Sequence, residues 1–280
     1  MKKISRRSFL AAAGLTVAAL ALTACGGSAS TASSAAASSV AASSEAASTS
    51  AAAAELTTVE AGKLTMATNA TFPPYEMTTD AGTIEGIDVD TAQAIAEKLG
   101  LELQIDDMDF DAALLSVQQG KADIAMAGIT VTDERMAVMS FSDSYATGIQ
   151  SVIVPEGSDI ASVDDLAGKK IGTQRGTTGY IYCSDDFGDD AVVAYDNGLT
   201  AVQALNNGQV DAVVIDNAPA KEFVAANPGL VILDTSYAEE DYAIGMAKGS
   251  SLEDAVNAAL EELKADGTLQ SIVDKYITAE

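Results

Sequence analysis

The sequence predicts an α/β protein built from two similar lobes. From residue 62 onward, apolar runs of strand length alternate with amphipathic segments of helical period. One pattern occurs twice, because the helical segments that stop at Gly120 and at Gly208 are each followed by a short turn and an apolar run. Each turn carries an aspartate at the same place, Asp123 and Asp211 respectively. This repetition predicts a duplicated lobe.

Glycines mark the ends of the predicted elements in the first copy of the pattern. Residues 63–67 form a predicted strand, and residues 90–99 form a helix with one apolar face that stops before Gly100. A helix over 111–119 and an apolar strand over 122–127 follow. The first strand has a weaker counterpart in the second copy, at residues 170–172, and each leads into a polar loop.

The ends of the two repeated strands predict the position of a ligand site. Ligands of parallel α/β sheets bind at the carboxyl ends of the strands. The repeated strands end at residues 127–130 and 215–217, which are rich in small and polar side chains. If the lobes face each other, these two segments meet across a cleft.

The chain ends in two predicted helices. Apolar residues from Leu252 to Leu263 recur at the spacing of a helix with one buried face. Ser251 and Asp254 predict a capping box at its start, and Gly267 predicts its end. A last short helix is expected over residues 269–276.

The composition excludes several classes of protein. A formal net charge of −26 argues against nucleic acid, whose phosphates require clustered Lys and Arg. The chain has no histidine, the commonest general base and metal ligand. Its two cysteines are far apart and lack zinc-ligand spacing. We therefore expect no metal and no cofactor.

The first 60 residues predict export and attachment to a membrane. Residues 1–24 place basic residues before an apolar run of about sixteen residues, which suits a signal peptide. The run ends in LTAC at 22–25, which resembles the lipobox of bacterial lipoproteins and implies acylation at Cys25. SRRSFL at 5–10 resembles a twin-arginine signal, so export by Sec and by Tat both stay open. Residues 25–60, rich in Ser and Ala, read as a disordered linker.

Several motifs in one order resemble the polar-amino-acid-binding proteins of ABC importers. These are extracellular solute-binding proteins of family 3, with the type II periplasmic-binding fold. The resemblance covers about residues 62–278 and rests on FPPYE at 72–76, GIDVD at 86–90, AGITVTDER at 127–135, FSDSY at 141–145, GTT at 176–178 and ADGT at 265–268.

The resemblance implies a ligand cleft between two lobes that are joined by two crossover hinge strands. The hinge strands are expected near 144–150 and 238–243. Lobe 1 would comprise residues 61–146 and 242–280, and lobe 2 residues 147–241. The protein would be a monomer on the extracytoplasmic face of the bacterial cell membrane. It would bind a free L-amino acid and deliver it to an ABC permease and its ATPase subunit.

Arg135 is the predicted partner of the ligand carboxylate. Its planar guanidinium can bind two carboxylate oxygens, and the preceding Thr132 predicts a helix N-terminus with free N–H groups nearby. The family motif places its carboxylate-binding arginine here. From the residues alone, a surface arginine paired with Asp133 or Glu134 is the alternative.

The remaining predicted site residues depend more on the resemblance. Asp216 would accept the ammonium group, although an aspartate before Asn217 can also simply start a turn. The other residues that the resemblance assigns to the ligand are Asn69, Phe72, Phe110, Ala127, Gly128, Thr130, Gln174, Thr177 and Thr178. Thr130 and the Gly128 carbonyl would share the ammonium protons, Thr177 and Thr178 would donate N–H groups to the carboxylate, and the two phenylalanines would stack on the ligand.

Substrate identity and two other functions stay open. Asn69 and Gln174 stand where some relatives carry a charged residue, so an uncharged polar side chain such as that of glutamine or cystine is favoured. An enzyme of the same fold, such as a dehydratase, would need a carboxylate base, with Glu76 or Asp216 as the candidate. A sensor or receptor lobe for another small solute is the second alternative.

Overall fold

A five-stranded sheet forms the core of the first lobe. The computed structural model describes residues 56–277. The strands of this sheet, in spatial order, are β5 (Glu102–Asp107), β1 (Lys63–Thr68), β6 (Ile124–Ala125), β14 (Gly245–Ala247) and β7 (Met139–Phe141). Its helices are α1 (Ile87–Leu99), α2 (Phe110–Gln118), α3 (Asp133–Val138), α7 (Glu253–Ala265) and α8 (Thr268–Tyr276). A separate small sheet contains β2 (Thr71–Phe72), β3 (Glu76–Thr78) and β4 (Ile84–Glu85).

A six-stranded sheet forms the core of the second lobe. Its main path runs β10 (Val192–Tyr195), β9 (Ile171–Gln174), β11 (Ala212–Asp216), β8 (Ala146–Pro155) and β12 (Leu230–Ile232), and β13 (Ala238–Tyr242) also pairs with β8. The helices of this lobe are α4 (Thr178–Phe187), α5 (Gly198–Asn206) and α6 (Asn217–Ala226). Two short 3₁₀ turns are η1 (Val163–Leu166) and η2 (Asp189–Ala191).

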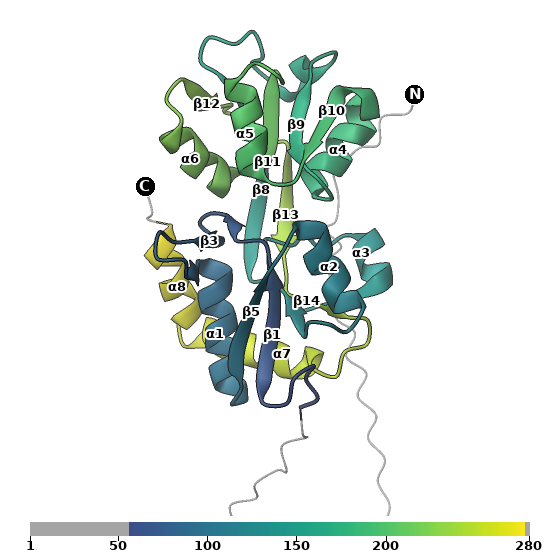
Figure 1. Cartoon of the computed structure of the whole chain (residues 1–280), viewed down its shortest axis with the longest axis vertical. Helices are drawn as coiled ribbons and strands as arrows, with labels where there is room; N and C mark the ends of the chain where they lie inside the picture. The colour runs from purple at the N-terminus through teal and green to yellow at the C-terminus, as the bar shows by residue number, and fades with distance from the viewer. Residues whose placement is uncertain (1–55, 278–280) are drawn as a thin grey trace, which may run out of the picture. The chain divides into compact units, whose positions relative to one another are not determined.

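Strands β8 and β13 connect the two lobes (Figure 1). They pair antiparallel, with Glu240 opposite Gly148, and Tyr242 at the end of β13 forms a further bridge with Thr130. The predicted α/β fold with two crossover strands is confirmed. The exact lobe boundaries at 146/147 and 241/242 stay predictions, and they lie inside or at the ends of these two strands.

The repeated aspartates explain why the same pattern occurs in both lobes. Asp123 accepts the backbone N–H of Thr65 at 2.8 Å, and Asp211 accepts that of Lys170 at 2.7 Å. Each carboxylate therefore binds the backbone of the neighbouring parallel strand one residue before the first pair of that ladder, Met66 with Ile124 and Ile171 with Ala212. Gly120 and Gly208, at φ +65° and +67°, reverse the chain just before each aspartate. The pattern repeated in the sequence thus corresponds to the same local structure in both lobes, a glycine turn followed by an aspartate that binds the neighbouring strand.

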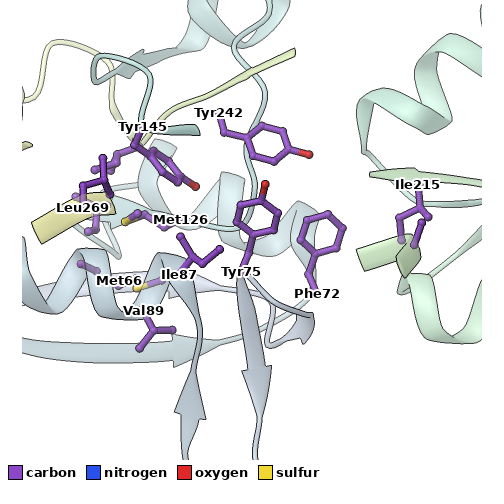
Figure 2. Packing of buried hydrophobic residues seen from close by; sticks show 14 of the residues in the cluster. Met66, Phe72, Tyr75, Ile87, Val89, Met126, Tyr145, Ile215, Tyr242 and Leu269 are labelled. Atoms are coloured by element: carbon purple, nitrogen blue, oxygen red, sulfur yellow. The ribbon is translucent and has the colours of Figure 1, made fainter. Parts of the chain in front are cut away.

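Aromatic side chains pack where the first lobe meets the hinge (Figure 2). The rings of Phe72 and Tyr75 stack with their centroids 5.7 Å apart, and Tyr75 meets Tyr242 edge-on at 5.5 Å. Tyr242 is 1% exposed and comes from β13. The hinge strand is therefore anchored in the core of the first lobe.

Two boundaries of the predicted elements were wrong. Helix α1 begins at Ile87 rather than at residue 90. Its N-cap residue, Gly86, packs so closely against the carbonyl of Tyr75 that a Cβ at Gly86 would overlap it, and the helix starts directly after this contact. The strand predicted over 122–127 is reduced to Ile124–Ala125.

The capping box predicted at the last long helix is absent. Helix α7 has Leu252 at its N-cap without a side-chain cap bond, and Ser250 rather than Ser251 binds the backbone there, its Oγ accepting the N–H of Leu252 at 3.2 Å. Gly267, at φ +82°, separates α7 from α8.

The predictions for the N-terminal region fall largely outside the structure. The signal peptide at 1–24, Cys25 and most of the linker at 25–60 lie before residue 56 and so are not among the described residues. Within 56–277, no helix is long and apolar enough to cross a membrane.

Candidate functional site

A cavity lies between the two lobes, at the carboxyl ends of strands from both sheets. All eleven residues that the sequence assigned to the ligand line it, together with five others. The complete lining is Asn69, Phe72, Glu76, Phe110, Ala127, Gly128, Thr130, Arg135, Gln150, Gln174, Thr177, Thr178, Val214, Ile215, Asp216 and Tyr242. The cleft predicted from the strand ends therefore exists, while ligand binding by these residues remains to be tested.

Arg135 enters the cavity from the first turn of α3. The Thr132 hydroxyl caps this helix by accepting the Arg135 N–H at 3.2 Å, as predicted. The guanidinium is buried, lies 5.4 Å from the centre of the Phe110 ring, and donates to the carbonyls of Thr130 at 2.8 Å and Gly176 at 3.0 Å. The side chain thus points into the cleft. The alternative, a surface arginine paired with Asp133 or Glu134, is therefore wrong.

Burial lowers the pKa of Arg135, and the negative charge of Glu240 partly offsets that effect. An arginine stays charged despite such a shift, because its ordinary pKa is far above neutral. The cavity therefore contains a buried cation with a planar donor group, and this suits a carboxylate.

Asp216 enters the cavity from the second lobe, at the end of β11. Its carboxylate accepts the N–H of Ala218 at 2.9 Å, which caps α6, and the N–H of Ile149 at 2.8 Å. The turn-starting role named as the alternative is therefore real. It does not exclude a ligand role, since a carboxylate oxygen can accept more than one hydrogen bond. Burial raises the Asp216 pKa to about 6, opposed by these two N–H donors.

Thr177 and Thr178 begin helix α4 at the wall of the cavity. The Thr177 hydroxyl caps the helix by accepting the Tyr180 N–H at 3.3 Å, and Thr178 is its first residue. The first N–H groups of a helix have no partner within it. This wall can therefore offer backbone donors to an anion.

Two amides lie opposite each other at another part of the cavity. Gln174 donates from Nε2 to Asn69 Oδ1 at 3.0 Å, across the two lobes. The same Asn69 oxygen also accepts the Thr71 hydroxyl at 2.9 Å, and Asn69 Nδ2 donates to the Met108 carbonyl at 2.9 Å. Most of the hydrogen-bonding capacity of Asn69 is therefore used within the protein, while Gln174 keeps Oε1 and one N–H for a ligand.

Gly128 leaves space for the ring of Phe72 at the cavity. It has φ +55°, and a Cβ there would lie 2.8 Å from the Phe72 ring. Its N–H donates to Asp88 at 3.0 Å, while the adjacent Ala127 is buried in the lining. The predicted segment 127–130 therefore contributes backbone and small side chains, which lets the ring of Phe72 reach the cavity.

Glu76 is a buried acid that the sequence analysis considered only as an enzymatic base. It is 0% exposed and lines the cavity, and its polar partner there is the buried carboxylate of Asp88, with which it can share a proton. Burial and the neighbouring Asp88 raise its pKa well above the ordinary value. Burial also raises the pKa of Asp88 to about 6. A ligand with a cationic side chain would favour the ionised form of this buried carboxyl pair.

Sequence reasoning missed the residues that the hinge contributes. Gln150 and Tyr242 line the cavity from β8 and β13, and Glu240 lies behind the lining, 6% exposed. Glu240 stands in the run Glu239-Glu240-Asp241, which reads as a solvated acidic stretch. The signal that could have found it is strand alternation, because Glu239 and Asp241 are exposed and only the residue between them faces inward.

The described residues hold no obvious metal site. Between residues 56 and 277, no three His, Cys, Asp or Glu side chains are grouped as metal ligands. The expectation that the protein needs no metal stays a prediction.

Known proteins share this fold over most of the chain. Residues 64–279 match the model of the bacterial extracellular solute-binding proteins, family 3. A probable histidine-binding protein of Neisseria gonorrhoeae is 33% identical over 77% of this chain and 83% of its own. The L-cystine-binding protein TcyJ of Escherichia coli is 31% identical over 79% and 85%.

Solved structures give the same result. An ancestral arginine-binding protein bound to glutamine is 41% identical, with a TM-score of 0.75, over 79% of this chain and 100% of the other. The arginine-, lysine-, histidine-binding protein ArtJ of Geobacillus stearothermophilus is 34% identical, with a TM-score of 0.75, over 78% and 96%. On this evidence the chain belongs to the bacterial extracellular solute-binding proteins, family 3.

Proposed function

We propose that this protein binds a free polar L-amino acid in the interlobe cavity and delivers it to an ABC permease and its ATPase. The observation that carries the proposal is the pair of opposite charges buried in one cavity. Arg135 comes from the first lobe and Asp216 from the second. A zwitterion presents a carboxylate and an ammonium group that match the two, whereas a simple anion or cation would leave one buried charge without a partner.

The placement of the two charges also explains how a ligand would favour closure. A ligand shifts a conformational equilibrium only if it binds one state more tightly than the other. An amino acid held by Arg135 and Asp216 touches both lobes, so its full binding energy is available only when the lobes are closed. We infer that the permease recognises this closed form.

Asn69 and Gln174 support the first candidate for the side chain, a polar uncharged group like that of glutamine or cystine. The free Oε1 and N–H of Gln174 can pair with a carboxamide. The named relatives include proteins for cystine and for glutamine.

Glu76 favours a second candidate, a cationic side chain. Its carboxyl group is buried in the cavity wall beside that of Asp88, so two acids lie together there. A guanidinium would pair with it through two parallel hydrogen bonds. Several relatives are named for arginine.

Replacement of Glu76 by Gln distinguishes the two candidates. If the ligand is arginine, E76Q should weaken arginine binding by roughly tenfold or more, the size expected for a charged hydrogen bond, and leave glutamine binding nearly unchanged. If the ligand is glutamine or cystine, calorimetric titration should show wild-type binding of that amino acid and none of arginine.

Membrane attachment through Cys25 is part of the proposal. The lipobox resemblance supports acylation of this cysteine and a position on the extracytoplasmic face, after export by Sec or Tat. On such a tether the receptor would work as a monomer that stays close to its permease.

The competing enzyme reading makes a different prediction. We propose that the protein is not an enzyme, and the family of solute-binding proteins supports this. Incubation with amino or keto acids, followed by chromatography, should return each compound unchanged. A sensor lobe would bind the solute equally well, and transport of labelled amino acid by cells lacking this protein separates the two roles.

Replacement of Arg135 by Ala tests the binding proposal directly. We expect R135A to lose measurable binding while it keeps a cooperative thermal transition, because truncation of one partner in a buried charged contact costs about 2–5 kcal/mol. The control is R175A, since Arg175 is exposed beside Gly176 and should bind normally. If R135A retains wild-type affinity, Arg135 is not in the ligand site.

A further inference from the structure

Glu240 connects both lobes to the hinge through a single oxygen. Its Oε2 accepts the Thr130 hydroxyl at 3.1 Å, the Thr178 hydroxyl at 3.0 Å and the Gln150 side-chain amide at 2.9 Å. Thr130 belongs to the first lobe and Thr178 begins α4 of the second. Glu240 is on β13, opposite Gly148 of β8. The carboxylate therefore joins four segments that meet at the cavity.

These bonds determine whether the hydroxyl groups of Thr130 and Thr178 act as donors or as acceptors toward a ligand. An ionised carboxylate can only accept hydrogen bonds, and a threonine hydroxyl has a single proton to donate. Either hydroxyl could also donate to the other, 3.4 Å away, but the carboxylate oxygen at 3.0–3.1 Å is nearer and charged, so it is the stronger acceptor. Thr130 and Thr178 therefore give their protons to Glu240. The two oxygen atoms, 3.4 Å apart, then have only lone pairs left for a ligand.

This polarity matters because both threonines line the cavity, whereas Glu240 itself lies behind them. Lone pairs attract an ammonium group, which carries only donors, and repel a carboxylate. Asp216 in the same lining adds a further acceptor. Arg135, by contrast, is a pure donor. The cavity thus has an acceptor part and a donor part, and Thr178 belongs to both, since its hydroxyl oxygen accepts while its backbone N–H at the start of α4 can donate.

We propose that Glu240 is a positioning residue that fixes Thr130 and Thr178 as acceptors and so makes the site selective for a ligand with a free α-ammonium group. The proposal rests on the proposed function, since it assigns an additional residue to the same site. Glu240 would act without touching the ligand, through the two hydroxyl groups.

The test compares ligands with and without the amino group. Wild-type protein and E240Q are titrated calorimetrically with L-arginine, L-glutamine and L-cystine, and with the analogue of each in which hydrogen replaces the α-amino group. A glutamine at position 240 has an NH₂ group that can donate to the threonines, which frees their protons to point at the ligand. The matched control is E239Q, which removes the same charge from the exposed neighbour on the same strand.

We expect wild type and E239Q to prefer the amino acid strongly over its analogue. In E240Q this preference should fall by roughly tenfold or more, as expected for the loss of hydrogen bonds to a charged group. A general structural defect would weaken both ligands equally and leave the ratio unchanged, so an unchanged ratio in folded E240Q overturns the proposal.

Two further variants keep the test decisive if E240Q does not fold. T130V and T178V each remove one acceptor and should each lower the same ratio, whereas an unchanged ratio in both overturns the proposal. Wild-type protein that binds none of these three and no other free amino acid in a full panel would overturn this inference together with the proposed function. Wild type that binds one of them, with ratios insensitive to all these variants, would overturn this inference alone.

Discussion

The guanidinium of Arg135 donates to the carbonyl of Gly176 at 3.0 Å, and this bond joins α3 of the first lobe to the loop before α4 of the second. Gln174, two residues earlier, makes the contact to Asn69 across the same gap. The residues assigned to the ligand are thus also residues that hold the closed lobes together. Ligand affinity and closure should therefore respond to the same mutations.

Gly176 is a position where added volume would meet the opposite lobe. It has φ +74°, and a Cβ there would overlap the carboxylate of Asp111, which comes from α2 of the other lobe. We expect G176A to weaken ligand binding by up to about tenfold, since the added Cβ displaces the exposed Asp111 side chain from the contact between the lobes and inserted atoms cost about 1–3 kcal/mol. Calorimetric titration measures the loss.

The control for this substitution is G157A. Gly157 also has a positive φ, +78°, but a Cβ there would meet open space. Both alanines carry the cost of left-handed backbone, and only G176A also meets a side chain of the opposite lobe. D111A in the G176A background should restore affinity, and failure to do so would show that the collision is not the cause.

Ligand affinity should fall as the pH falls from 7 to 5. Binding of an ammonium group requires ionised Asp216, whose pKa is raised to about 6 by burial. Protonation then competes with the ligand, and one such group predicts about tenfold weaker binding at pH 5 than at pH 7. Titration of glutamine in both buffers checks this. Affinity that rises toward pH 5 would contradict the assignment of Asp216 to the ammonium group.

E76Q should stabilise the ligand-free protein at pH 7. Burial raises the folded-state pKa of Glu76 above its unfolded value, so the folded state binds this proton more tightly. The stability contributed by the bound proton is lost as the pH rises above the unfolded pKa. Glutamine has no proton to lose, so the gain in melting temperature over wild type should be larger at pH 7 than at pH 4. An equal gain at both values would point to packing instead.

Replacement of Cys25 by Ser tests the membrane anchor. Without the thiol the lipobox cannot be acylated, so we expect C25S protein in the soluble extracytoplasmic fraction and wild type with the membranes. The folded part should be unaffected, and ligand affinity is the control. C25S that stays with the membranes would require another means of attachment.

Much of the fold was predictable because it depends on local signals. The period of the apolar residues, the turn glycines and the repeated aspartates predicted the α/β class and the duplication. Asp123 and Asp211 indeed make equivalent hydrogen bonds to the backbone of a neighbouring strand. The wrong details depended on distant contacts. Helix α1 starts early because Gly86 meets Tyr75, a neighbour that helical period does not reveal.

For the site, too, local signals were predictable and distant contacts were not. Strand ends and motifs led to Arg135 and Asp216, which lie in one cavity. They could not reveal the role of Glu240, because its three donors come from segments 62 to 110 residues away in sequence. Nor could they reveal that Asn69 spends most of its hydrogen bonds within the protein.

The most direct test of the central claim is thermal unfolding with single amino acids, after denaturation and refolding to remove any ligand carried through purification. A ligand at a thousand times its dissociation constant stabilises the folded state by about 4 kcal/mol, which corresponds to roughly 8–16 °C for a folded region of this size. We predict a shift of this order with one or a few polar amino acids and none with the rest. No shift with any free amino acid would contradict the proposal that this cavity is an amino-acid site.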